Sequence, residues 1–115
     1  MGLSTHILDT ALGRPVSNIE IKLSQFRDNP AGGAWHPIGS ARTDADGRCK
    51  TLLGDTPLAA GDYKLHFDTR VYFTDQHLPT LYPYIEIVFA VTDPAQHHHI
   101  PLLLTANGYT TYRGS

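Results

Sequence analysis

This sequence has little cysteine and no large excess of charge of either sign. Its 115 residues include 1 cysteine, Cys49, so no intramolecular disulfide can form, which excludes a disulfide-stapled secreted scaffold. Lysine and arginine number 9 against 11 aspartate and glutamate residues, for a formal charge of -2. Nucleic acid and anionic lipid surfaces attract proteins with an excess of basic residues, so we expect neither as a partner.

Long apolar runs and helical periodicity are missing as well. No stretch approaches the ~20 apolar residues of a membrane span, and residues 1–6 resemble no signal peptide. No long stretch keeps the i, i+3, i+4, i+7 spacing of an amphipathic helix. We therefore predict a cytoplasmic protein built mainly from strands. The length predicts one domain, residues 1–115, which is too small to enclose a deep cleft, so an active site would form more easily between subunits.

Alternation of apolar and polar residues indicates strands along most of the chain. Ile19, Ile21 and Leu23, for example, alternate with polar residues, as a strand with one solvated face requires. Turn-forming residues separate such segments, as in 28–33, and seven or eight short strands at this spacing indicate a sandwich. Strands are predicted at 3–8, 19–26, 38–42, 63–68, 84–91, 100–105 and 109–112, and one short helix at 71–78.

The segment 84–91 departs from simple alternation because part of its second face is also apolar. Ile85 and Ile87 point one way, whereas Val88 and Ala90 point the other. A covered second face is expected here, which indicates contact with another subunit.

Histidine is frequent, at 7 of 115 residues, and a run of three occupies positions 97–99. In a strand, His97 and His99 share a face while His98 points away. Two imidazoles on one face could bind a metal ion if His6 or a carboxylate completed the site. The alternative is a solvated turn that follows residues 93–95.

The other candidate residues also permit structural roles. His6 lies within the predicted first strand, where it could be a partly buried structural side chain rather than a catalytic one. Arg48 follows the Asp46-Gly47 turn and could simply be solvated. A lone cysteine such as Cys49 usually packs as a small apolar side chain, and a terminal residue such as Ser115 is usually frayed.

Several segments together resemble the transthyretin-like 5-hydroxyisourate hydrolases. The terminal tetrapeptide YRGS discriminates best, because the transthyretins of similar fold lack both it and the histidines. His98 stands where the family often has tyrosine. The matching segments are LSTHILDT at 3–10, GRP at 13–15, TDADGR at 43–48, YTTYRGS at 109–115 and the stretch 82–104, so the resemblance spans the chain.

The resemblance implies an all-β, transthyretin-like sandwich of two four-stranded sheets with one short helix. It also implies a homotetramer, a dimer of dimers with active sites in the channel between dimers. The implied reaction converts 5-hydroxyisourate to 2-oxo-4-hydroxy-4-carboxy-5-ureidoimidazoline in urate degradation, without metal or cofactor. The implied catalytic residues are His6, Arg48, His99 and Ser115, and the implied substrate-binding residues are His6, Arg48, His97, Tyr112, Arg113 and Gly114.

This set also satisfies the chemistry of cyclic amide hydrolysis. A histidine, whose pKa is ordinarily about 6.5, can activate water and protonate the leaving nitrogen, and either His6 or His99 could be the base. Arg48 stays protonated and can hold substrate oxygens or developing negative charge. Two alternatives stay open: a carrier that binds a small aromatic ligand without turnover, and a metalloenzyme that uses His97, His99 and His6. Desolvation of so many polar groups argues against a carrier of apolar ligands.

Overall fold

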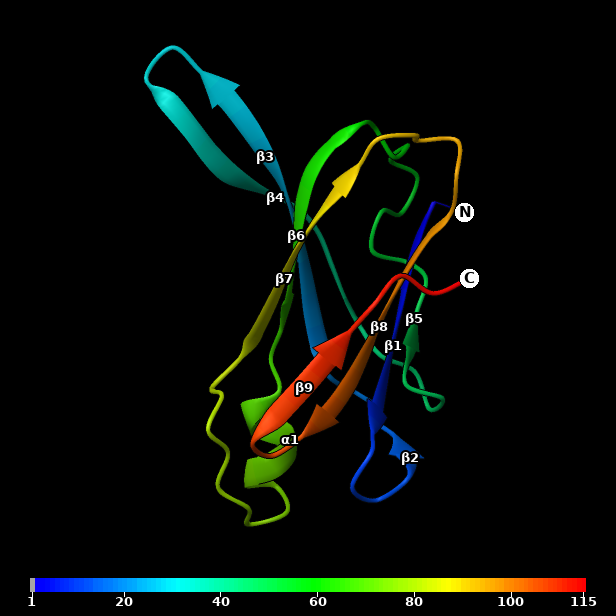
Figure 1. Cartoon of the computed structure of the whole chain (residues 1–115), viewed down its shortest axis with the longest axis vertical. Helices are drawn as coiled ribbons and strands as arrows, with labels where there is room; N and C mark the ends of the chain where they lie inside the picture. The colour runs from blue at the N-terminus through cyan, green and yellow to red at the C-terminus, as the bar shows by residue number, and fades with distance from the viewer. Residues whose placement is uncertain (1) are drawn as a thin grey trace.

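The computed structural model describes residues 2–115 as a β-sandwich with one short helix (Figure 1). This confirms the predicted all-β sandwich with one short helix. The elements are β1 (Leu3–Asp9), β2 (Arg14–Pro15), β3 (Glu20–Asn29), β4 (Gly32–Arg42), β5 (Arg48–Cys49), β6 (Gly61–Phe67), α1 (Arg70–Thr74), β7 (Ile85–Val91), β8 (His98–Thr105) and β9 (Gly108–Thr111).

The first sheet has the order β2-β1-β8-β9, with β5 also paired to β1. This sheet has five strands instead of the four that the resemblance implies, because two short strands pair with β1: β5 with Thr5 and His6, and β2 with Leu8 and Asp9. The two segments meet at Ile7, whose carbonyl oxygen accepts from the Val16 N–H at 3.0 Å and whose N–H donates to the Gly47 carbonyl oxygen at 2.8 Å. On its other side, β1 runs parallel to β8 along its whole length.

The second sheet has the order β4-β3-β6-β7. The turn expected at 28–33 is the tip of a long hairpin, in which Asn29 already pairs with Gly32, so β4 begins well before the expected position 38. Phe26 and Trp35 pack edge to face across this hairpin at 5.3 Å, and aromatic cross-strand pairs favour such an extension. In Figure 1 the hairpin of β3 and β4 projects beyond the rest of the sandwich.

The short helix lies where the sequence predicts one, although it is shorter than expected. It covers Arg70–Thr74 instead of 71–78. His77 has a φ of 56°, in the left-handed region, which is incompatible with continued right-handed helix. No helix within residues 2–115 is long and apolar enough to cross a membrane.

The core lies between the two sheets and is formed by the apolar positions that alternate along the strands. Ile7, Leu65 and Leu102 are completely buried there, and Cys49 is free and buried among apolar side chains, as expected. Val88 on the second face of β7 is 60% exposed in the single chain, so the subunit contact expected at this face stays a prediction.

Candidate active site

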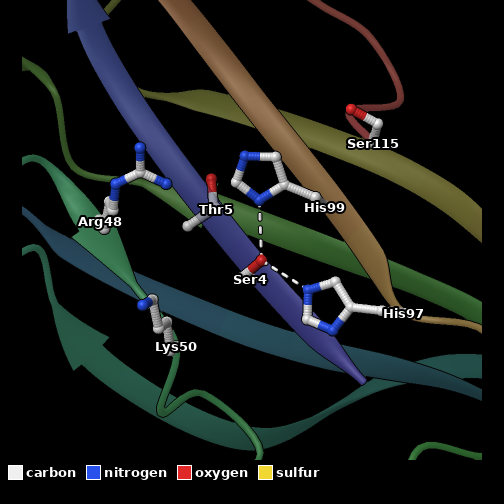
Figure 2. Close-up of a pocket in the computed structure, with 7 residues that line it drawn as sticks. All are labelled: Ser4, Thr5, Arg48, Lys50, His97, His99 and Ser115. Atoms are coloured by element: carbon white, nitrogen blue, oxygen red, sulfur yellow. Dashed lines mark hydrogen bonds between the residues drawn. The ribbon is translucent and has the colours of Figure 1, made fainter. Parts of the chain in front are cut away.

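A polar cavity of about 170 Å³ lies beside the beginning of β1 and β8 (Figure 2). The elements that form it are far apart in the sequence: β1, β5 with the residue that follows it, the start of β8 and the end of the chain. Its lining residues are Ser4, Thr5, Arg48, Lys50, His97, His99 and Ser115.

Strand register explains why these residues meet. In the parallel pairing of β1 with β8, Ser4 is the partner of His99, and in the antiparallel pairing of β1 with β5, His6 is the partner of Arg48. Ser4 and His6 are two residues apart on one strand, so both side chains project from the same face of the sheet. Because Thr5 between them is buried, this face is the one opposite the core.

Ser4 joins the two histidines of this face. Its Oγ lies 2.7 Å from His99 Nδ1 and 2.8 Å from His97 Nε2 (Figure 2). The Gly2 N–H donates to His97 Nδ1 at 3.0 Å. His97 and His99 therefore lie on the same side of the chain, as the alternation predicts. His98 points the other way and is buried, with its Nδ1 2.9 Å from the Gln96 carbonyl oxygen.

The pKa of His99 is lowered from its ordinary value of 6.5. Burial of the ring is the largest cause, followed by electrostatic interaction with His6, Arg48 and His97, which disfavours a second proton on His99. A weaker interaction with the main chain of Ser4 acts in the opposite direction. Both of the larger causes favour the neutral form of the His99 ring.

The turn before β5 positions both His6 and Arg48. Asp44 Oδ1 accepts hydrogen bonds from the Asp46 and Arg48 N–H groups at 2.9 and 3.0 Å, and these bonds lower the Asp44 pKa. The Asp46 carbonyl oxygen lies 2.9 Å from His6 Nε2. Gly47 permits the turn with a φ of 74°, and an added Cβ would lie 2.5 Å from the Ile7 carbonyl oxygen.

The end of the chain is docked rather than frayed. The Gly114 N–H donates to the His99 carbonyl oxygen at 2.8 Å, and Ser115 lines the cavity. A Cβ at Gly114 would lie 2.5 Å from His99 Cδ2, so glycine is needed for the tail to pass this close to the ring.

Two other candidates from the tail lie elsewhere in the single chain. Tyr112 and Arg113 line a second cavity of about 260 Å³ between β7 and β9, and Arg113 donates to Gln96 Oε1 at 2.9 Å. The structure thus assembles His97, His99, Arg48 and Ser115 around one cavity, places His6 beside Arg48, and directs Tyr112 and Arg113 away.

Sequence reasoning gave no role to Ser4 or Lys50 in this cavity, nor to Asp44 in its turn. The position of Ser4 two residues before His6 was the available signal, since both must share a face of the strand. Lys50 follows β5 and carries no comparable signal. Across the described residues, 2–115, no three or more His, Cys, Asp or Glu side chains are grouped so that they could hold a metal ion, and His97, His99 and His6 form no such group.

The strand order is that of a transthyretin-like sandwich, and its first sheet presents histidine and arginine side chains to a polar cavity. The sequence model of the HIUase/Transthyretin family matches residues 3–114, and the chain belongs to this family. It is 42% identical over 113 residues to the 5-hydroxyisourate hydrolase of Salmonella dublin, covering 98% of this chain and 80% of that protein.

Solved structures of an enzyme and of a transthyretin both resemble this fold. The 5-hydroxyisourate hydrolase of Klebsiella pneumoniae has a TM-score of 0.81 at 32% identity, covering 98% of both chains. The transthyretin of Sparus aurata has a TM-score of 0.86 at 32% identity, covering 98% of this chain and 96% of that chain. The fold is therefore shared by both kinds of protein, and the cavity has to distinguish between them.

Proposed function

We propose that this protein is a 5-hydroxyisourate hydrolase, which uses water to open the ring of 5-hydroxyisourate and gives 2-oxo-4-hydroxy-4-carboxy-5-ureidoimidazoline. The observation that carries this proposal is the cavity in which two histidines, an arginine and the docked terminal serine converge. The relatives at 42% identity that are named as this hydrolase support the same function.

The polar lining favours turnover over carriage of an apolar ligand. Every residue that lines the cavity carries a polar or charged side chain, so an apolar ligand would have to displace water from groups that it could not hydrogen-bond. A polar heterocycle that is rich in carbonyl and N–H groups would satisfy them.

The roles follow from the chemistry of each side chain. Arg48 is held by β5 at the cavity, and its guanidinium can bind the substrate's oxygens and the charge that develops on them. His6 and His99 are the candidates for proton transfer, and Ser115 offers a hydroxyl to the bound substrate. His97 and Gly114 contribute by holding His99 and the tail. Tyr112 and Arg113 face the second cavity, so substrate contact by them would require a rearranged tail or a neighbouring subunit.

We further propose that residues 1–115 form a single domain that assembles as a homotetramer, a dimer of dimers, in the cytoplasm. The apolar side chain of Val88 is 60% exposed on β7, and Tyr112 is 55% exposed beside the second cavity, which is typical of surfaces that a subunit covers. Analytical ultracentrifugation tests the assembly, and a monomer at micromolar concentration would refute it.

The decisive experiment follows the decay of 5-hydroxyisourate, generated from urate by urate oxidase in the cuvette. Wild-type protein should accelerate the decay, whereas His6→Ala and a variant without Ser115 should not. No acceleration by the wild type would leave a carrier function, tested by saturable binding of a small aromatic ligand. Loss of activity upon chelation, with stoichiometric zinc in untagged protein, would contradict a metal-independent reaction.

A further inference from the structure

The hydrogen bonds around Ser4 determine which nitrogen of His99 carries the proton. We infer that Ser4 is a positioning residue that, together with His97, holds neutral His99 with its proton on Nε2. The tautomer follows from the geometry alone, whereas its consequence for catalysis rests on the proposed hydrolase function.

The direction of the hydrogen bonds is set at Gly2. A backbone N–H can only donate, and the Gly2 N–H points at His97 Nδ1 from 3.0 Å. His97 Nδ1 must therefore be the unprotonated, accepting nitrogen. A neutral imidazole has one N–H, so the proton of His97 is on Nε2, the atom that lies 2.8 Å from Ser4 Oγ.

Ser4 transmits this direction to His99. Its hydroxyl accepts from His97 Nε2–H and has one proton to donate, and His99 Nδ1 lies within 2.7 Å. Within residues 2–115 the two rings are the only hydrogen-bond partners of Ser4 Oγ, so accepting from both would leave the proton of this buried hydroxyl without a partner. Ser4 therefore donates to His99 Nδ1, which leaves the His99 proton on Nε2. The reverse direction would place a proton on His97 Nδ1 directly opposite the Gly2 N–H, so two donors would face each other.

The charges around His99 agree with a neutral ring. Arg48 of β5, Lys50 after it and His97 just before β8 line the same cavity as His99. His6 of β1 is paired with Arg48. A second proton on His99 would add another positive charge to this group. The lowered pKa of His99 expresses the same repulsion together with its burial.

This assignment separates the two histidines chemically. A neutral His99 with Nε2–H is a hydrogen-bond donor, suited to the oxygen of the scissile carbonyl as negative charge develops on it. His6 donates its Nε2–H to the Asp46 carbonyl oxygen, so the basic nitrogen of neutral His6 is Nδ1.

Each proton in the resulting reaction is accounted for. Water attacks the carbonyl carbon while His6 takes one of its protons, and the imidazolium then returns that proton to the ring nitrogen as the C–N bond breaks. A C–O bond forms, a C–N bond breaks, and His6 ends neutral. His99 and Arg48 stabilise the oxyanion and exchange no proton.

Nitrogen-15 NMR of the histidine rings, recorded on unliganded protein near neutral pH, tests the tautomer directly. Wild type should show His97 and His99 protonated on Nε2, with Nδ1 shifts of unprotonated nitrogen. Ser4→Ala should give a mixture of His99 tautomers, and Ser4→Thr should restore the wild-type spectrum because it keeps the hydroxyl. His99 protonated on Nδ1 in the wild type, or a His99 spectrum unchanged in Ser4→Ala, would overturn the inference.

Kinetics with 5-hydroxyisourate provide the second measurement. Ser4→Ala should lower kcat by up to about 10²-fold with a smaller change in KM, and Ser4→Thr should recover most of it. Thr105→Val is the matched control, because it removes one hydroxyl bond, to the Gly108 carbonyl oxygen at 3.1 Å, at the far end of β8. It should change neither the spectrum nor kcat.

The two measurements fail independently. The inferred wild-type tautomer in a protein that does not hydrolyse 5-hydroxyisourate would refute the proposed function and leave the role of Ser4 intact. An active enzyme whose Ser4→Ala variant keeps full kcat would refute the role of Ser4 in catalysis and leave the function intact.

Discussion

Gly114→Ala tests whether the docked tail is part of the catalytic apparatus. The new Cβ would lie 2.5 Å from Cδ2 and 3.2 Å from Cγ of His99, and 3.3 Å from Cγ of Pro101, whereas ordinary contacts are 3.4–4 Å. Either the tail or the ring must therefore move by about 1 Å.

The magnitude depends on which partner moves. Overpacking a rigid core costs about 1–3 kcal/mol, but the tail is exposed at residues 111–113 and can retreat, so the loss in stability should be below this range. Catalysis is less tolerant, since a displacement of about 1 Å can cost on the order of 10²-fold in rate. We expect kcat/KM to fall by about this factor while Tm changes by only a few degrees.

Steady-state kinetics with 5-hydroxyisourate and thermal unfolding measure the two effects separately. Gly108→Ala is the matched control: its Cβ meets only Thr105 Oγ1, at 3.6 Å, and it should retain full activity. An unchanged kcat/KM in Gly114→Ala would refute a catalytic role of the docked tail, because the reaction would then tolerate the displacement that the new Cβ makes unavoidable.

The other predictions concern charge, pH and buried hydrogen bonds. Arg48→Lys should lower kcat/KM on the order of 10²-fold despite its conserved charge, because the planar guanidinium fork is lost; near wild-type kinetics would show a merely solvated residue. The pKa of His99 is lowered in the folded state, so the unfolded chain binds this proton more readily. The free energy of unfolding should therefore be highest above pH 6.5 and should fall as the pH drops below this value. Urea unfolding at several pH values measures this loss, which should be smaller in His99→Asn; an equal loss would contradict the assignment. Tyr72→Phe removes the hydroxyl that donates to buried Asp9 at 2.6 Å and should lower the unfolding free energy by about 1–3 kcal/mol in urea titrations, with activity retained. An unchanged unfolding free energy would show that water replaces the tyrosine.

Sequence periodicity was sufficient to predict the strands that carry the core. Ile21 and Leu65 alternate with polar neighbours, and both are completely buried on the inner faces of their strands. The same rule placed His97 and His99 on one side of the extended chain and His98 on the other, because the period of two fixes which side chains share a face.

Features that depend on contacts between distant segments were beyond such reasoning. The hairpin of β3 and β4 extends through a segment of turn-forming residues because Phe26 packs on Trp35, and Lys64 of β6 lies 5.0 Å above the Trp35 ring. The division of one edge into β2 and β5 likewise depends on how two separate segments meet β1. The residues near each of these segments in the sequence do not reveal which distant segment will contact it.

The candidate site shows the same distinction at the level of single atoms. Sequence reasoning selected His6 and His99 but could not assign their protons, since the assignment depends on groups that the fold brings to each ring. Ser4 and Gly2 become partners of the histidines only because β1 runs parallel to β8, and the Asp46 carbonyl oxygen reaches His6 only because Asp44 closes its turn.

The size of the cavity connects this site to the expected assembly. About 170 Å³ is smaller than the ~300–1,000 Å³ of typical ligand pockets, and the cavity lies on the outer face of a sheet rather than in the core. A single chain thus offers one polar wall with its proton donor and cation already oriented. Exclusion of water, which strengthens every electrostatic interaction with the oxyanion, requires a second surface opposite this wall. A closed symmetric oligomer provides that surface with no additional sequence, because each subunit can cover the site of another.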